Sequence, residues 1–267
     1  MGDHDNGREP PASGPPASGG PKGPIRDELR PALPKRFYRT VTIGEKSEGS
    51  EPAVFSVLLD GRLLRTPLKR PLRFSRRALA ELVADEWAAQ ATVIDPATMH
   101  ATRILNSAID GVADKMADVA AEVAGFAGND LLCYRAEAPR GLVDLQDARW
   151  EPVLQAVERT LGCRFVRVAG IMHSAQPTET LQKISAAVTS LPPIKLAALH
   201  VLTTLSGSVL LALAVLRGLV TPEAAWIAAH TDEDWQISQW GEDQEASARR
   251  ALRALEFATA AKIVLID

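Results

Sequence analysis

The residues that could do chemistry are concentrated in one acidic segment near the C-terminus. Between positions 232 and 245 there are six acidic side chains and no basic one, and tryptophans interleave with them. The residues concerned are Asp232, Glu233, Asp234, Glu242, Asp243 and Glu245, with Trp235, Trp240 and, just upstream, Trp226. Paired carboxylates could act as acid and base or bind a cation. Tryptophan beside an acidic rim is instead typical of a protein interface that attracts a basic partner.

The rest of the sequence gives little support to acid–base catalysis or cation binding by these carboxylates. The spacing of His230, Asp232 and Asp234 is not specific for a metal, and the five histidines are scattered. There is no GxxxxGK[ST] loop, no GxGxxG after a strand, no GxSxG elbow and no HExxH. We therefore expect no metal and no cofactor. The alternative that stays open is a helical enzyme or a small-ligand or metal-binding protein that uses His230 and the acidic cluster at 232–245.

A purely structural role for the same residues is also open. Glu242 and Asp243 follow Gly241, where a helix should start, and acidic residues at a helix N-terminus are favoured by the macrodipole. Glu245 can pair with Arg249 one turn later. The tryptophans could belong to the hydrophobic core. The sequence alone does not separate this role from an interface.

Composition excludes several classes of protein. The 267 residues are 46% hydrophobic and 5% aromatic, and 42 of them are alanine, which favours helices in close contact. The net charge of −3 shows no basic excess of the kind that a nucleic-acid-binding protein carries. Cys133 and Cys163 form no CxxC pair, so we expect a protein with reduced thiols.

The predicted architecture is α+β, with a small N-terminal β-containing domain at 35–128 and a larger all-helical domain at 129–267. Residues 1–34 are rich in proline and glycine, and we expect this tail to be disordered. Strands are predicted at 36–43, 53–59 and 62–66. Asp60-Gly61 between the last two is a strong hairpin signal. Ser75 is a plausible N-cap for a helix at 76–90.

The rest of the chain shows mostly helical periodicity. After helices near 97–109 and 112–126, further helices are predicted at 144–161, 177–191, 193–217, 221–230 and 242–264, with one extended piece at 163–168. The 21 residues at 196–216 contain no formally charged side chain, and a segment of this length could span a bilayer. Polar residues in their first half also fit the central helix of a bundle.

Short motifs follow one another in a specific order along the chain. They are KRFY at 35–38, LDGRLLRTP at 59–67, ADEWAAQ at 84–90, DLLCYR at 130–135, DEDWQ at 232–236 and WGED at 240–243. In this order the chain from about Lys35 onward resembles the ATP synthase assembly chaperones, which attend the alpha subunit of the soluble catalytic head in mitochondria and alpha-proteobacteria. At 100–102 the sequence HAT departs from the family's common PLT.

The resemblance implies a non-enzymatic, soluble, monomeric chaperone that binds the free alpha subunit and neither nucleic acid nor membrane. It implies an orthogonal helical bundle, with 196–216 as its central helix. The bacterial cytoplasm or the mitochondrial matrix is the expected location. It favours an interface role for the acidic segment, with these partner-binding residues: Glu242, Asp243, Glu245, Trp240, Asp234 and Trp235. Structural roles are expected for Trp87, Asp60 and Gly61.

Overall fold

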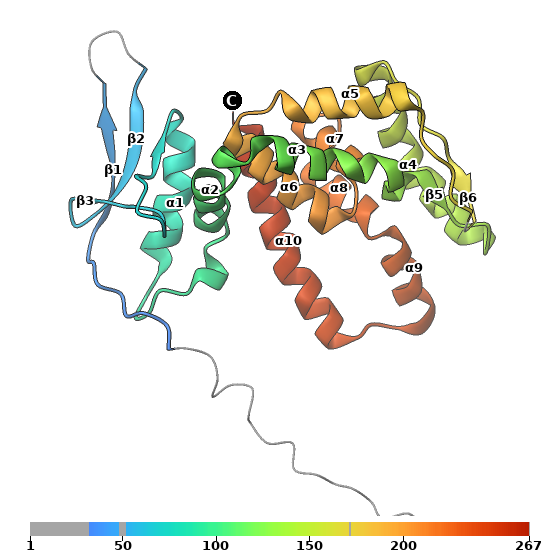
Figure 1. Ribbon diagram of the computed structural model, residues 1–267. Coiled ribbons are helices and arrows are strands. Elements are labelled where there is room, and N and C mark those ends of the chain that lie inside the picture. The colour runs from blue at the N-terminus through green and yellow to red at the C-terminus, as the bar shows by residue number, and fades with distance from the viewer. Residues whose placement is uncertain (1–31, 48–51, 171, 267) are drawn as a thin grey trace, which may run out of the picture. The chain divides into compact units, whose positions relative to one another are not determined.

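The structure is a computed structural model and describes residues 32–47, 52–170 and 172–266. Residues Pro34–Asp267 form one compact unit, distinct from Met1–Leu33 (Figure 1). The tail predicted at 1–34 lies outside the described residues except for its last three. Within the unit, four antiparallel strands come first and a mostly helical part follows, with two short strands among its helices, which confirms the predicted α+β class.

The strands form a small antiparallel sheet. β1 (Val41–Lys46) pairs along its full length with β2 (Val54–Leu59), and β2 also pairs with the short strands β3 (Arg62–Leu63) and β4 (Arg73–Phe74). Asp60 and Gly61 connect β2 to β3 with φ angles of 48° and 77°. Positive φ at both central positions is what a tight hairpin turn of type I′ requires. The predicted hairpin is confirmed.

The first strand begins later than predicted. β1 starts at Val41, whereas the sequence suggested 36–43. The reason is that the Asp60 carboxylate accepts hydrogen bonds from the backbone N–H groups of Arg39 and Thr40, at 3.1 and 2.8 Å. These bonds hold the pKa of Asp60 below its ordinary value, the Thr40 N–H contributing most. Two backbone donors are thus bound by a side chain and take no part in a strand ladder.

Helix α1 (Arg77–Ala89) packs against β1 and β2 with the side chains of Leu79, Ala80 and Val83 buried beneath it. Its N-cap residue is Arg76, which makes no side-chain capping bond, so the N-cap predicted at Ser75 is wrong. A 3₁₀ turn, η1 (Pro96–Thr98), leads into α2 (His100–Asp110). α2 contacts α1 on one side and α6 and α10 on the other, and so joins the strand-bearing part to the helices.

The helical part contains the predicted helices, but the helix predicted at 193–217 is divided in two, a helix at 231–240 was not predicted, and the extended piece predicted at 163–168 is a strand only at its end. The 3₁₀ turn η2 (Val112–Asp114) precedes α3, and η3 (Phe126–Asn129) and η4 (Leu131–Cys133) follow it. The strands β5 (Tyr134–Arg135) and β6 (Val168–Ala169) pair in parallel. The helices are α3 (Met116–Gly125), α4 (Arg140–Leu161), α5 (Thr178–Thr189), α6 (Pro193–Ser206), α7 (Val209–Leu216), α8 (Pro222–Ala229), α9 (Thr231–Trp240) and α10 (Gln244–Leu265). The domain boundary at 128 stays a prediction.

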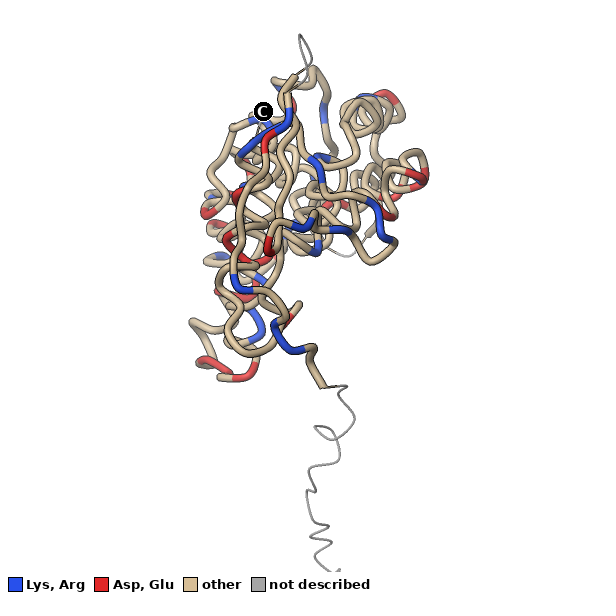
Figure 2. Tube along the Cα trace, turned by 90° about the vertical axis from the view of Figure 1, so that its left-hand side faces the viewer, with Lys and Arg blue, Asp and Glu red and all other residues tan. Residues whose placement is uncertain are grey.

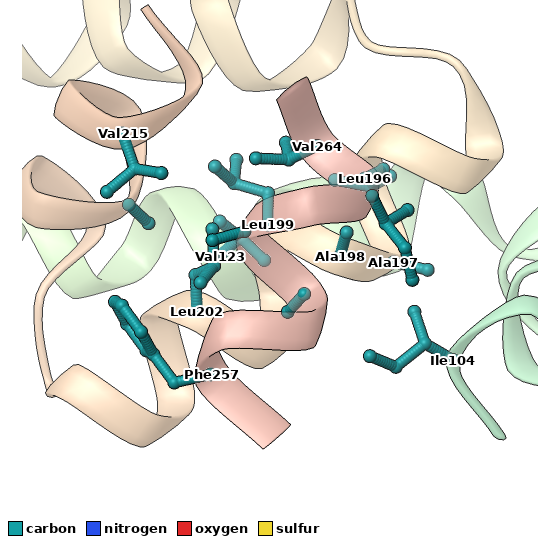
Figure 3. Packing of buried hydrophobic residues seen from close by; sticks show 14 of the residues in the cluster. Ile104, Val123, Leu196, Ala197, Ala198, Leu199, Leu202, Val215, Phe257 and Val264 are labelled. Carbon is teal, nitrogen blue, oxygen red and sulfur yellow. The ribbon is translucent and has the colours of Figure 1, made fainter. Parts of the chain in front are cut away.

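The apolar segment 196–216 is not one helix. Gly207 ends α6 in the left-handed region with φ 69°, and Ser208 caps α7 by accepting a bond from the Leu211 N–H. The two helices pack against each other, and seven consecutive residues of α7, 209–215, are buried. Figure 3 shows the core where Leu199 and Leu202 of α6 meet Phe257 of α10. No helix in the described part of the chain is long and apolar enough to cross a bilayer.

Candidate functional site

The structure divides the acidic segment into two parts with different surroundings. Residues 232–235 lie in α9, a helix that the sequence did not predict. Residues Glu242 and Asp243 lie in the turn between α9 and α10, and Glu245 lies in the first turn of α10. We call Trp240, Glu242, Asp243 and Glu245 the α9–α10 turn cluster.

The carboxylates of α9 are bound by side chains of neighbouring helices. Asp232 accepts a 2.6 Å bond from the amide of Gln146. Asp234 forms ion pairs with Arg149 of α4 at 2.8 Å and with Arg250 of α10 at 2.6 Å. Both arginines and Asp234 are less than one-third exposed. The Asp234 carboxylate therefore ties α9 to two other helices, although it was predicted to bind a partner.

Trp235 and His230 also make contacts within the fold. A Cβ added to Gly141 of α4 would lie 2.5 Å from the far edge of the Trp235 ring, so the indole sits directly on that glycine. The His230 ring packs against that of Trp226, tilted by 42° with centroids 3.9 Å apart, and its Nδ1 lies 2.9 Å from the Trp226 carbonyl oxygen. Burial lowers the pKa of His230 below its ordinary value.

These contacts separate the residues considered as metal ligands. His230, Asp232 and Asp234 are each engaged by a different partner. Among the described residues there is no group of three or more His, Cys, Asp or Glu side chains that could hold a metal ion. The geometry therefore gives no support to a metal site built from His230 and this cluster.

The α9–α10 turn cluster is exposed to solvent. Trp240 is 79% exposed, the highest value among the large hydrophobic side chains of the described residues. The Asp243 side chain caps α10 by accepting a 2.7 Å bond from the Ala246 N–H, and Glu245 lies 3.5 Å from Arg249. Glu242 makes no hydrogen bond or ion pair with any described residue. The cluster thus combines an exposed indole with one carboxylate, that of Glu242, that has no partner in the described part of the chain.

Comparison with known proteins places the chain in a family. Residues 35–158 match the sequence profile described as ATP12 chaperone protein. The chain is 40% identical to Atp12 from Paracoccus denitrificans, with a TM-score of 0.79 over 86% of this chain and 97% of that one. The chain belongs to the ATP12 chaperone family. The Atu1473 protein of Agrobacterium tumefaciens is 44% identical, with a TM-score of 0.82 over 92% of this chain and 91% of that one.

A eukaryotic relative agrees with this assignment. The protein named atp12, mitochondrial, of Schizosaccharomyces pombe is 25% identical over 202 residues, which are 71% of this chain and 69% of that protein. The resemblance to a chaperone family read from the motifs is confirmed.

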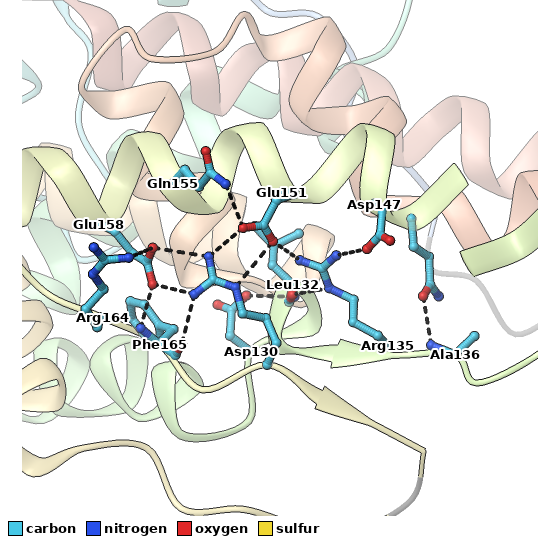
Figure 4. Close-up of polar contacts among 12 residues, drawn as sticks. Asp130, Leu132, Arg135, Ala136, Asp147, Glu151, Gln155, Glu158, Arg164 and Phe165 are labelled. Carbon is cyan, nitrogen blue, oxygen red and sulfur yellow. Dashed lines mark hydrogen bonds and ion pairs between the residues drawn. The ribbon is translucent and has the colours of Figure 1, made fainter. Parts of the chain in front are cut away.

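The DLLCYR motif at 130–135 contains residues whose roles the sequence did not reveal. Arg135 is 8% exposed and binds three groups: the Leu132 carbonyl at 2.9 Å, Asp147 at 2.8 Å and Glu151 at 3.1 Å (Figure 4). Glu151 also pairs with Arg167 at 2.7 Å, and this hydrogen bond is the main reason that the pKa of Glu151 falls to about 2. The network fastens the β5–β6 strands to α4.

The three residues predicted to be structural lie together in the strand-bearing part. Asp60 and Gly61 form the turn described above, and Trp87 of α1 packs its ring against that of Tyr38 with centroids 5.5 Å apart. Tyr38 Oη donates a 2.6 Å bond to the Trp87 carbonyl oxygen. Trp87 is therefore placed as a packing residue within this part of the ATP12 fold.

Proposed function

We propose that the chain is a chaperone for the assembly of the F-type ATP synthase catalytic head and that it binds the unassembled alpha subunit. The proposal is supported by membership of the ATP12 family. A subunit that waits for its neighbours exposes apolar surface that promotes aggregation. A chaperone that covers such a surface reversibly is displaced when the proper partner binds, by mass action. No nucleotide and no enzymatic step is required.

The α9–α10 turn cluster is the surface that we infer to bind the alpha subunit. An indole that is 79% exposed to water contributes little to the fold and is available for burial by a partner. Tryptophan is enriched among the residues that dominate binding energy, and charges around it steer the encounter. The carboxylates beside Trp240 favour a basic patch on the alpha subunit, next to an apolar pocket that takes the indole.

Glu242 is the residue that best tests this interface. Asp243 caps α10, and Glu245 pairs with Arg249, so their replacement would disturb the helix as well as any interface. Asp234 and Trp235 are held by other helices, and we assign them the role of positioning the turn. Glu242 has no such contact with a described residue, which means that a change there reports on binding alone.

The test is co-elution of the purified chain with isolated alpha subunit in size-exclusion chromatography at micromolar concentration. We expect a soluble one-to-one complex, with Glu242→Lys and Trp240→Ala each weakening it by about tenfold or more, equivalent to about 1.4 kcal/mol. Asp85→Lys is the matched control, because Asp85 is exposed on α1 and its side chain makes no hydrogen bond or ion pair with any described residue.

Circular dichroism and melting temperature should be unchanged in all three variants. If the wild-type chain failed to co-elute with the alpha subunit, the proposed function would be wrong. If the complex formed but Glu242→Lys and Asp85→Lys weakened it equally, the function would stand and the position of the interface would be wrong.

A further inference from the structure

A second surface, in the strand-bearing part, has the features of a binding site. A cavity of about 540 Å³ opens between the β2–β3 hairpin, the segment before β1, and α1. Its walls include Phe37, Tyr38, Leu64 and Trp87, and its rim includes Arg62 and Arg65. Phe37 is 72% exposed at the edge of this cavity and contacts Tyr38 edge-on, with centroids 5.3 Å apart. We call this surface the hairpin cradle.

The hairpin cradle carries an excess of positive charge. The Arg62 side chain makes no hydrogen bond or ion pair with any described residue, and the Arg65 side chain donates only to the Lys69 carbonyl oxygen, at 2.9 Å. Arg36 adds a guanidinium over the Tyr38 ring, 4.6 Å from its centroid. The one carboxylate among the described lining residues, Asp60, is occupied by Arg39 and Thr40. Figure 2 views the molecule from this side, with basic residues in blue.

Arg62 and Arg65 form no ion pair with any described acid, and the same is true of Arg73, Arg159 and Arg217, which are exposed elsewhere on the surface. Elsewhere in the described residues several arginines pair with acids: Arg70 with Asp114, Arg77 with Glu81 and Arg140 with Asp144. At the hairpin cradle no described acid forms an ion pair with Arg62 or Arg65, although the net charge of the whole chain is −3. A planar guanidinium forms its strongest hydrogen bonds with a carboxylate, in bidentate geometry. The guanidinium groups of Arg62 and Arg65 are therefore available to bind carboxylates of another molecule.

We propose that the hairpin cradle binds an acidic peptide segment with an apolar anchor residue, presented by a partner protein. Arg62 and Arg65 take the carboxylates of the segment, and Phe37 and the cavity take its anchor. The site is distinct from the α9–α10 turn cluster in residues, elements and sign of charge. It stands whether or not the alpha subunit is the client, and it gives the chain two surfaces with opposite electrostatic preferences.

The probe is a fluorescein-labelled peptide of about a dozen residues in which a central Leu-Phe pair is flanked by Asp and Glu. Fluorescence anisotropy with the full chain should show saturable binding that weakens as ionic strength rises, as expected for charge pairs at a surface. The double variant Arg62→Glu/Arg65→Glu should lose about tenfold or more in affinity. Phe37→Ala should lose affinity for this peptide but not change binding of a peptide whose Leu-Phe pair is replaced by Ala-Ala.

The matched control is Arg140→Glu/Arg217→Glu, which makes the same change in net charge at two exposed positions on the helical part. Its affinity should equal that of the wild-type chain. If the double variant does not fold, Arg62→Glu alone replaces it in the binding measurement, because the Arg62 side chain has no partner among the described residues. Equal losses in both double variants would overturn the proposal. Binding of a single-stranded oligonucleotide without binding of the acidic peptide would also overturn it.

Discussion

Ser208 donates a 2.7 Å hydrogen bond to Asp130, from a position 78 residues further along the chain. The same carboxylate accepts bonds from the backbone N–H groups of Leu132 and Leu210, each at 3.1 Å. Asp130 thereby caps the turn η4 and the start of α7 together. Because the side chain is fully buried and pairs with no basic group among the described residues, its charge is stabilised by these donors.

The first prediction concerns the pH dependence of stability. Burial raises the pKa of Asp130 to about 6, against the opposing hydrogen bonds from Ser208 and the backbone. The unfolded chain loses this proton near its ordinary value of 3.8, so between pH 4 and pH 6 the native state holds the proton and the unfolded state does not. The stabilisation from Asp130 is complete below pH 4 and declines as the pH rises through about 6.

Asp130→Asn isolates this contribution because asparagine does not titrate. The difference in unfolding free energy, wild type minus variant, should fall by roughly 3 kcal/mol between pH 4 and pH 7, as a shift of about two pKa units implies. Urea unfolding of both proteins across this range measures it. Other groups, such as Glu151 with its low pKa, titrate in both proteins and cancel. Parallel pH profiles for the two proteins would contradict the assignment.

The second prediction concerns Arg135 and the β5–β6 attachment. Arg135→Ala leaves the Leu132 carbonyl and Asp147 without their donor and Glu151 with only Arg167 and Gln155. We expect a loss of about 2–3 kcal/mol in unfolding free energy, since the guanidinium and the Leu132 carbonyl are buried while Asp147 and Glu151 are partly exposed. Arg140→Ala removes an exposed pair with Asp144 and should cost under about 0.5 kcal/mol. Similar losses for the two variants would exclude a special role for Arg135.

The sequence predicted those features of the fold that are determined by residues close together in the chain. The Asp60-Gly61 hairpin is set by two adjacent residues, and the amphipathic helices by apolar spacing within each helix, so both were predictable. Helix α9 was missed because its first turn is acidic and polar, and its carboxylates are bound by Arg149 and Arg250 from other helices. The roles of Asp130 and Arg135 were missed for the same reason. The DLLCYR motif contains both residues, but it does not show which distant residues they contact.

The break between α6 and α7 was not predicted for a different reason. Gly207 lies in an apolar run and fits the small residue of a tight helix contact, which hid its role as a C-terminal cap. The difference between the two roles is its φ of 69°, which only a structure reveals.

The third prediction tests that role. Gly207→Ala should lower the unfolding free energy by about 1 kcal/mol, because alanine is strained at positive φ although no atom crowds the position. Gly125→Ala is the matched control, since Gly125 ends α3 with φ −58° and also has open space around it. There alanine should stabilise the protein by about 0.5–1 kcal/mol. Changes of the same sign in the two variants would show that the left-handed conformation at Gly207 is not what matters.

The last prediction concerns Trp87. Its ring is half-buried against Tyr38, while its indole N–H is enclosed and meets no acceptor among the described residues. Trp87→Phe therefore removes no hydrogen bond and should cost about 1 kcal/mol for lost volume, whereas Trp87→Ala should cost about 3 kcal/mol. Trp87→Glu should cost still more, because a carboxylate would replace an apolar contact. The Tyr38 bond to the backbone carbonyl of residue 87 remains possible in every variant.

Trp240→Ala is the control of the same residue type, since that side chain is 79% exposed and its removal should change the unfolding free energy by less than about 0.5 kcal/mol. Urea unfolding followed by far-ultraviolet circular dichroism is suitable, because tryptophan fluorescence changes with the substitutions themselves. The expected order of stability is Trp240→Ala, Trp87→Phe, Trp87→Ala and Trp87→Glu, from highest to lowest. A large loss in Trp87→Phe would mean that the indole N–H has an acceptor after all. A large loss in Trp240→Ala would make that side chain a packing residue and remove the anchor from the proposed interface.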